Sequence, residues 1–241
     1  MKIMTFNIQH GLDYRRVLSE NAHIIDLKAI ADTIRAQGAD LCGLNEVNGA
    51  GADEVYTAQA QTIASHLGWN YYFAEAIRFK GTNPYGNALV TRWPILKAET
   101  IGIPDPEVKD EDAYYETRCI LKALVDADGT PLTVLVVHIG LAKAEARNAV
   151  ATLLSVLSEV TGPVVLMGDF NLQPDDPILA PLLAVMDDTA DKLTGCRLSF
   201  PSNKSEIKID YILSREMTCE TAEIPQIVVS DHCPYTAVFE G

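Results

Sequence analysis

The sequence lacks any arrangement of cysteines that would hold a small scaffold together. Its five cysteines are odd in number, lie scattered along the chain and form no C-x-x-C pair. This spacing excludes a disulfide framework and a zinc knuckle. We therefore expect reduced thiols with mostly structural roles and a reducing compartment. The cysteines are Cys42, Cys119, Cys196, Cys219 and Cys233.

Long apolar runs and linkers are also missing. No stretch approaches 18 consecutive apolar residues, so we expect no membrane span. Met1 leads directly into a strand pattern, without the apolar region of a signal peptide, which predicts a cytoplasmic protein. No Pro-, Gly- or Ser-rich segment divides the 241 residues, and no internal repeat occurs. Residues 1–241 are therefore predicted to form one domain.

Positive charge is scarce. Nineteen Lys and Arg residues stand against 33 Asp and Glu residues, which gives a formal net charge of −14. Nucleic-acid-binding proteins gain affinity from Lys and Arg side chains that displace counterions, so this balance disfavours DNA or RNA as a partner. It still permits binding of a single phosphate group, because a local basic rim or a divalent metal ion can supply the charge.

What the sequence does contain is an alternation of strand and helix patterns, which predicts an α/β fold. Helices are expected over 26–37, 56–67 and 143–159, with a helical turn near 177–185. Strands are expected at 2–8, 40–47, three segments of 70–101, a hairpin over 118–138, and 163–168, 207–213, 218–224 and 235–240. Connecting loops are expected at 9–24, 47–55, 102–116 and 187–204, and loops of this kind carry specificity.

Two short polar segments follow apolar runs near the C-terminus. Gly168-Asp169-Phe170-Asn171 comes directly after Val164-Val165-Leu166-Met167, and Ser230-Asp231-His232 comes after Ile227-Val228-Val229. Burying such polar groups without partners costs several kcal/mol, on the order of 2–7 for an uncharged group. The fold must therefore satisfy them or use them, and a strand that ends this way indicates a functional site.

Other predicted strands end in the same manner. Together these side chains form a set of carboxylates, amides and two imidazoles, which suits Mg²⁺ or Mn²⁺ better than zinc. The chemistry indicated is attack of a metal-positioned water on an electrophile that accumulates negative charge, most naturally a phosphoryl group. The set comprises Asn7, Glu46, His138, Asp169, Asn171, Asp210, Asp231 and His232.

With these segments in view, the chain resembles the endonuclease/exonuclease/phosphatase superfamily, the DNase-I-like fold. The matching segments occur in family order: Thr5-Phe6-Asn7 with His10-Gly11, Leu44-Asn45-Glu46-Val47, Gly86-Asn87-Ala88-Leu89-Val90-Thr91-Arg92, Val137-His138-Ile139-Gly140-Leu141, Gly168-Asp169-Phe170-Asn171, Ile209-Asp210-Tyr211 and Ser230-Asp231-His232. Among the branches, the chain looks most like the small bacterial metal-dependent hydrolases. The resemblance implies a four-layer α/β/β/α sandwich of two packed mixed β-sheets flanked by helices, with the site at one end.

The resemblance also implies roles for the polar residues. Glu46 would be the principal metal ligand, with Asn7 and Asp231 completing or supporting the site. Asp169 would orient or deprotonate the attacking water, and Asn171 would hold the phosphate or the nucleophile. Asp210 would pair with His232, and His138 would contact another phosphate oxygen. Either Asp169 or the Asp210–His232 pair handles the decisive proton. Many nucleases of the family carry a carboxylate where this chain has Gln9, so a second metal ion is in doubt.

Three further residues are candidates for contacting substrate: His10, Asn87 and Arg118. Each has a structural alternative, since His10 lies in a loop, Asn87 follows a glycine and suits a turn, and Arg118 suits a surface ion pair. Four basic residues could form a positive rim or simply be solvated: Arg78, Lys80, Lys143 and Arg147.

Three functions are compared on this basis. The leading one is a Mg²⁺- or Mn²⁺-dependent phosphodiesterase or phosphatase that acts on a small or headgroup-like phosphate ester. The second is a DNA endonuclease or exonuclease, which the acidic composition disfavours. The third is a catalytically silent scaffold for protein binding, which should have lost at least one of Glu46, Asp169, Asp210 or His232, whereas all four are present.

Overall fold

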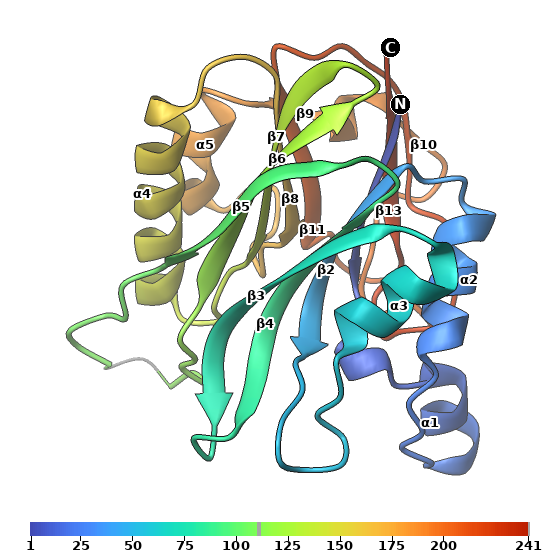
Figure 1. The fold of residues 1–241 in the computed structure, drawn as a ribbon. Helices are drawn as coiled ribbons and strands as arrows, with labels where there is room; N and C mark the ends of the chain where they lie inside the picture. The colour runs from blue at the N-terminus through green and yellow to red at the C-terminus, as the bar shows by residue number, and fades with distance from the viewer. Residues whose placement is uncertain (110–111, 241) are drawn as a thin grey trace.

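The computed structural model describes residues 1–109 and 112–240. Two mixed β-sheets pack face to face, and helices cover the outer face of each (Figure 1). This arrangement confirms the expected α/β/β/α sandwich.

The first sheet has seven strands in the order β10-β12-β13-β1-β2-β4-β3. β1 and β2 are parallel, β10 and β12 are parallel, and the other neighbours are antiparallel. In chain order the strands are β1 (Lys2–Asn7), β2 (Leu41–Asn48), β3 (Asn70–Phe79), β4 (Asn83–Thr91), β10 (Leu193–Thr194), β12 (Cys219–Glu223) and β13 (Tyr235–Phe239).

The second sheet has six strands in the order β5-β6-β7-β8-β11-β9. Its one parallel pair among the described residues joins β7 to β8. The strands are β5 (Ile95–Gly102), β6 (Cys119–Ala127), β7 (Thr130–His138), β8 (Val164–Asp169), β9 (Asp187–Asp188) and β11 (Asp210–Arg215).

Three apolar layers hold the sandwich together. The layer between the sheets contains Ile3, Leu89, Val136, Met167 and Ile212, all fully buried. Outside the first sheet, α2 (Leu27–Ala36) and α3 (Gln59–Leu67) pack their apolar faces on β1, β2 and β4. Outside the second sheet, α4 (Lys143–Glu159) and α5 (Ala180–Leu183) cover β7, β8 and β11. None of the described helices is long and apolar enough to cross a membrane.

The main departure from the predicted elements is in residues 9–24, which were expected to be a loop. They contain α1 (Tyr14–Glu20), which starts where the Asp13 carboxylate accepts a hydrogen bond from the Arg15 amide and ends at Asn21 in the left-handed region. No residue of α1 is buried, so the helix has no apolar periodicity to reveal it.

Smaller differences occur in two other predicted loops. Residues 187–204 contain β9, β10 and a 3₁₀ turn at Thr189–Lys192. The predicted loop 102–116 includes positions 110 and 111, which lie outside the described residues.

Candidate active site

The polar strand ends converge at one end of the sandwich because of strand direction and register. The parallel pairs β1–β2 and β7–β8 bring their carboxyl ends to this edge. Asn7 aligns with Asn45, and His138 aligns with Asp169. β11 runs antiparallel to β8, so its first residue, Asp210, aligns with Asp169. Asp169 therefore lies between His138 and Asp210 within the second sheet.

The residue before Asp169 has to be a glycine. Gly168 has a φ of +144°, and a Cβ on it would lie 1.8 Å from the carbonyl oxygen of Val137 on β7. A side chain at this position would force β8 away from β7 and shift the carboxylate that follows.

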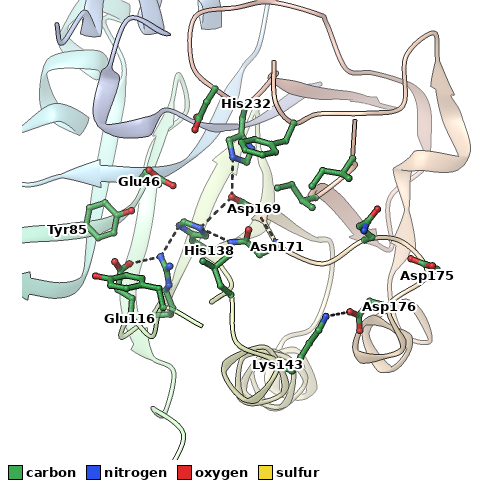
Figure 2. A pocket seen from close by; sticks show the side chains of 18 of the residues that line it. Glu46, Tyr85, Glu116, His138, Lys143, Asp169, Asn171, Asp175, Asp176 and His232 are labelled. Atoms are coloured by element: carbon green, nitrogen blue, oxygen red, sulfur yellow. Dashed lines mark hydrogen bonds and ion pairs between the residues drawn. The ribbon is translucent and has the colours of Figure 1, made fainter. Parts of the chain in front are cut away.

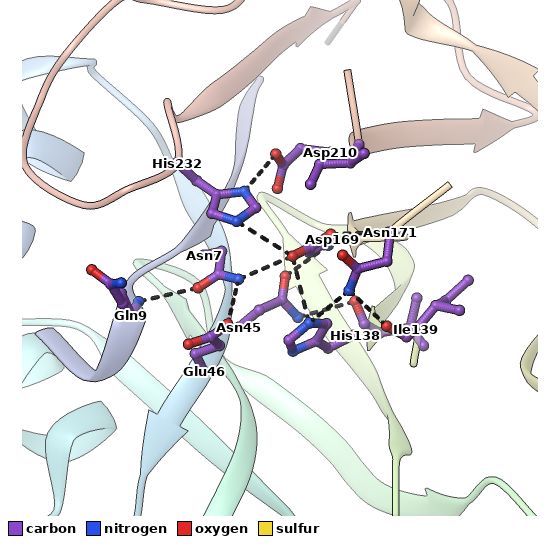
Figure 3. Close-up of polar contacts among 12 residues, drawn as sticks. Asn7, Gln9, Asn45, Glu46, His138, Ile139, Asp169, Asn171, Asp210 and His232 are labelled. Carbon is purple, nitrogen blue, oxygen red and sulfur yellow. Dashed lines mark hydrogen bonds and ion pairs between the residues drawn. The ribbon is translucent and has the colours of Figure 1, made fainter. Parts of the chain in front are cut away.

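Asp169 is the centre of the polar contacts (Figure 3). Its Oδ2 accepts a hydrogen bond from Asn7 Nδ2 at 3.0 Å and lies 3.5 Å from Nε2 of both His138 and His232. Its Oδ1 accepts a hydrogen bond from the backbone amide of Asn171 at 3.0 Å. Burial raises the pKa of Asp169 to about 7, against the opposing charge of His232.

His232 is held as a cation. Its Nδ1 lies 2.9 Å from Asp210 Oδ2, and its ring packs at 4.7 Å from that of Phe200. Burial disfavours the charge, but the carboxylates of Asp210 and Asp169 outweigh burial and raise the pKa of His232 to about 10. The predicted pairing of Asp210 with His232 is thus present in the contacts.

His138, on the other side of Asp169, is held neutral. Burial, and next the positive charge of Arg118, lower the pKa of His138 well below its usual range. Arg118 Nη1 lies 3.0 Å from His138 Nδ1 and also 2.7 Å from Glu116 Oε1. Asn171 Nδ2 lies 3.1 Å from His138 Nε2 and donates to the Ile139 carbonyl at 2.9 Å.

Glu46 and Asp231 bring carboxylate oxygens to the same end. Glu46 lies in the register shift of β2 between Leu44 and Val47, with a φ of +57°, so this irregularity directs its side chain toward the site. Asn7 Nδ2 donates to Glu46 Oε1 at 3.1 Å. Burial, with a further contribution from the charge of Glu46, raises the pKa of Asp231 to about 6.

This donor set fits a hard divalent cation. Carboxylate oxygens from Glu46 and Asp231, with the amide oxygen of Asn7, are the ligands that Mg²⁺ and Mn²⁺ prefer. Burial, and to a smaller extent the charge of Glu46, raise the pKa of Asp231, and a cation between the two carboxylates would relieve both costs.

A second possible metal group is formed by Asp169, Asp210 and His232, which bring one potential ligand atom each within 4.8 Å of one another. A histidine binds a metal ion through an unprotonated nitrogen, whereas both nitrogens of His232 face carboxylates, Nδ1 at 2.9 Å from Asp210 and Nε2 at 3.5 Å from Asp169. We therefore interpret this group as an ion-paired cluster, and the carboxylates of Glu46 and Asp231 are the other residues here that could hold a metal ion.

A cavity of about 810 Å³ opens over these residues (Figure 2). Tyr85, Tyr114, Glu116, Phe200 and Ile207 line it, together with the predicted site residues Glu46, Arg118, His138, Asp169, Asn171, Asp231 and His232. Among the described residues the cationic lysine and arginine side chains of its wall are Arg118 and Lys143. Both are paired with carboxylates, Arg118 with Glu116 and Lys143 with Asp176.

The three weaker candidates have different surroundings. Arg118 lines the cavity but is buried against Glu116 and His138. His10 lies beside Glu46, with 3.7 Å between Nε2 and Oε2. Asn87 lies away from the cavity wall, buried between β2 and β6, where it accepts from Asn45 Nδ2 at 2.9 Å and donates to the Cys119 carbonyl at 3.0 Å. Because the protein satisfies both ends of its amide, Asn87 is better placed to support β2 than to bind substrate.

The predicted positive rim is largely neutralised. Arg78 pairs with Glu75, Lys80 pairs with Asp53, and Lys143 pairs with Asp176. Arg147 lines a neighbouring groove beside α4.

Sequence reasoning missed two supporting residues. Asn45 donates to the Val137 carbonyl at 3.0 Å and accepts from the Asp169 amide at 2.9 Å, so it ties the two sheets together at the site. Asn45 lies between Leu44 and Glu46, where a predicted strand ends in polar residues, and this position could have indicated a role at the site. Glu116 is buried beside Arg118, and the Glu-x-Arg spacing just before β6 could have indicated this pair.

The fold and the site together define a hydrolase that acts on phosphoric esters. The model of the Endonuclease/Exonuclease/phosphatase family matches residues 4–232. The chain therefore belongs to this family, whose members hydrolyse phosphoester bonds.

Solved structures with the same fold come from several organisms. A functionally unknown conserved protein from Enterococcus faecalis V583 is 19% identical, with full coverage of both chains and a TM-score of 0.79. A mannosyl-6-phosphatase from Bacteroides thetaiotaomicron VPI-5482 is 14% identical, with full coverage of both chains and a TM-score of 0.77. D. rerio TDP2 in complex with a single-strand DNA product is 17% identical over 100% of this chain and 99% of that chain, with a TM-score of 0.73. A search of curated proteins gave no match.

Proposed function

We propose that this protein is a Mg²⁺- or Mn²⁺-dependent phosphoesterase that hydrolyses a small or headgroup-like phosphate ester by direct attack of water. The observation that carries the proposal is the surroundings of Asp169. One buried carboxylate oxygen lies 3.5 Å from a cationic imidazole on one side and 3.5 Å from a neutral imidazole on the other. Such a group suits proton removal from water beside a phosphoryl group.

Asp169 is the better candidate for the general base. Its pKa of about 7 lets it accept a proton near neutral pH, whereas His232 already carries one. In the proposed reaction the water oxygen forms a bond to phosphorus as its proton passes to Asp169. The ester P–O bond breaks, the departing alkoxide takes a proton from solvent water, and Asp169 returns the proton it accepted to the solvent, so that the base is regenerated.

The remaining polar groups would stabilise the charge that develops on the phosphoryl oxygens. His232 offers a fixed positive charge, and His138 and Asn171 offer uncharged polar contacts from the opposite side. Glu46, Asp231 and Asn7 would hold the metal ion, which when bound supplies Lewis-acid polarisation of the phosphate.

Substrate size and charge follow from the cavity. Its arginine and lysine are already paired with carboxylates, which leaves little attraction for a polyanion beyond the reacting phosphate. Tyr85, Tyr114 and Phe200 on the wall suit an uncharged organic group. A DNA nuclease is the alternative, because one solved structure with this fold holds a single-strand DNA product. A silent scaffold is disfavoured because Glu46, Asp169, Asp210 and His232 are all present at one site.

The test is a substrate panel in Mg²⁺, Mn²⁺ and chelator. Small phosphate monoesters and diesters, inositol phosphates, a phospholipid, single-stranded DNA and abasic duplex would be compared. We expect turnover of small or headgroup esters that chelator abolishes and excess metal restores.

Glu46→Gln should raise the half-saturating metal concentration at least about tenfold, whereas Glu99→Gln, on β5, should leave it unchanged. Full activity in chelator would refute the metal dependence, and a preference for abasic DNA would favour the nuclease.

A further inference from the structure

We infer that Arg118 is a positioning residue that fixes the proton of His138 on Nε2, so that a neutral imidazole presents an N–H donor to the substrate phosphate. The inference deepens the proposed function, because the role of this N–H rests on phosphate binding beside Asp169. It assigns Arg118 a different task from the substrate contact expected from the sequence.

The contact between Arg118 and His138 determines which nitrogen carries the proton. Arg118 Nη1 lies 3.0 Å from His138 Nδ1. A guanidinium donates hydrogen bonds and never accepts them, and it keeps its charge at all accessible pH values. Nδ1 must therefore be the unprotonated acceptor, which leaves the single proton of a neutral imidazole on Nε2.

Nε2 has one acceptor beside it for this proton, Asp169 Oδ2 at 3.5 Å. Its other neighbour, Asn171 Nδ2 at 3.1 Å, is a donor that directs one of its two hydrogens to the Ile139 carbonyl. The Nε2 proton must therefore point toward Asp169 and away from Asn171. The opposite tautomer would place an Nδ1–H against a permanent cation, and a doubly protonated ring would do the same. The Nε2–H form is the cheapest of the three.

Arg118 is itself held in place from behind. Glu116 Oε1 lies 2.7 Å from Arg118 Nη1, and both side chains are buried. The Glu116 backbone amide donates to Glu145 Oε1 at 2.8 Å, which anchors the segment to the first turn of α4. The chain of contacts Glu145–Glu116–Arg118–His138 therefore runs from a helix to the imidazole. Since Glu116 neutralises the guanidinium, Arg118 contributes orientation to the site more than net charge.

Nitrogen NMR of the imidazole tests the tautomer without any substrate. With ¹⁵N-labelled protein at pH 7.5, we expect His138 to show a protonated Nε2 and an unprotonated Nδ1. In Arg118→Met the two tautomers should mix, and in Arg118→Lys, which keeps a cationic donor, the Nε2–H form should persist. A wild-type His138 protonated on Nδ1, or on both nitrogens, would overturn the inference whatever the enzyme hydrolyses.

Kinetics test whether Arg118 acts through His138. On the best ester of the panel, Arg118→Met should lower kcat about 10- to 100-fold with little change in KM, the scale of one lost donor to the developing charge. Arg118→Lys should recover most of this loss. In a His138→Ala background, Arg118→Met should cost less than about twofold, because residues that act as a unit are not additive. An equal loss in both backgrounds would show that Arg118 contacts the substrate itself.

Two controls separate this effect from damage to the fold. Arg118→Met leaves Glu116 buried without its partner, so the double variant Glu116→Gln/Arg118→Met removes both charges and should show the same mixed tautomers. Arg215→Met removes another partly buried arginine, one that donates to the Leu157 and Val160 carbonyls away from the site. It should leave kcat and the His138 spectrum unchanged.

Discussion

The two imidazoles beside Asp169 make an instructive pair. Each places its Nε2 3.5 Å from the same carboxylate oxygen, and each is buried, yet they carry different charges. The difference lies at the far nitrogen. His232 Nδ1 faces the Asp210 carboxylate and the ring is cationic, whereas His138 Nδ1 faces the Arg118 guanidinium and the ring is neutral. The partner of the remote nitrogen therefore decides what each ring can offer to a substrate.

Removing the shared carboxylate should have the largest effect, because it removes the acceptor that both rings face. We expect Asp169→Asn to lower kcat about 1,000-fold or more, through loss of the base and of the charge that orders the site. Steady-state kinetics with the best ester of the panel measures this. Asp40→Asn, at the opposite end of β2 and paired with Arg92, is the matched control and should stay near wild type. Turnover of Asp169→Asn within tenfold of wild type would exclude Asp169 as the base.

Replacing Asp210, the carboxylate beside Nδ1 of His232, with an uncharged residue should reduce the difference in charge between His232 and His138. In Asp210→Asn the imidazolium loses its nearest carboxylate, so the pKa of His232 should fall from about 10 toward its ordinary value. We expect kcat to fall about 100-fold, and the ¹⁵N spectrum of His232 at pH 8.5 to change from doubly protonated to neutral. Asp188→Asn on the neighbouring strand β9 is the control. A His232 that stays doubly protonated would show that Asp169 alone holds the charge.

The buried lysine Lys208 tests whether the surroundings of a buried basic group also affect the stability of the fold. This is the smallest of the expected effects. Lys208 is 5% exposed, and its Nζ has no hydrogen-bond partner among the described residues. It lies 3.2 Å from the centre of the Tyr211 ring and 3.7 Å from Asp188 Oδ2. Burial outweighs the nearby carboxylates and lowers the pKa of Lys208 from 10.5 to about 8.

The folded protein thus carries a penalty for the charged lysine. The penalty is complete below pH 8 and disappears as pH rises to the unfolded value of 10.5, so wild-type stability should rise across this range. Lys208→Met should stabilise the fold by about 1–3 kcal/mol at pH 7, and by much less at pH 10.5. Urea unfolding at both pH values measures this, with exposed Lys204→Met as the control. Destabilisation at pH 7 would mean that the contact with Tyr211 outweighs burial.

Much of the architecture could be predicted from local pattern. The helix expected at 143–159 matches α4 because its apolar residues repeat at helical spacing against the sheet. The meeting of Asn7, His138 and Asp169 was expected because each follows an apolar run and lies in a segment that resembles the family. Register aligns His138 with Asp169 in one sheet, and the packing of the two sheets brings Asn7 of the other sheet to the same end. α1 escaped prediction because it buries no side chain.

Charge states could not be predicted in the same way. The sequence shows that His138 and His232 each follow an apolar run, but the two look alike at that level. Their difference depends on Arg118 and Asp210, which are 20 and 22 residues away and reach the rings through strand register. Asn45 was likewise missed, because its partners Val137 and Asp169 lie in the other sheet.

Asn45 gives the sandwich an unusual mechanical property. A carboxamide is short and has two rotatable side-chain bonds, yet here it clasps backbone atoms of β7 and β8 from a strand of the facing sheet. Sliding one sheet over the other by an ångström would break this clasp, since hydrogen bonds tolerate little stretching. The two sheets are therefore fixed to each other at the end that holds the site. Relative motions of the sheets should be smallest there, so the distances around Asp169 should stay constant.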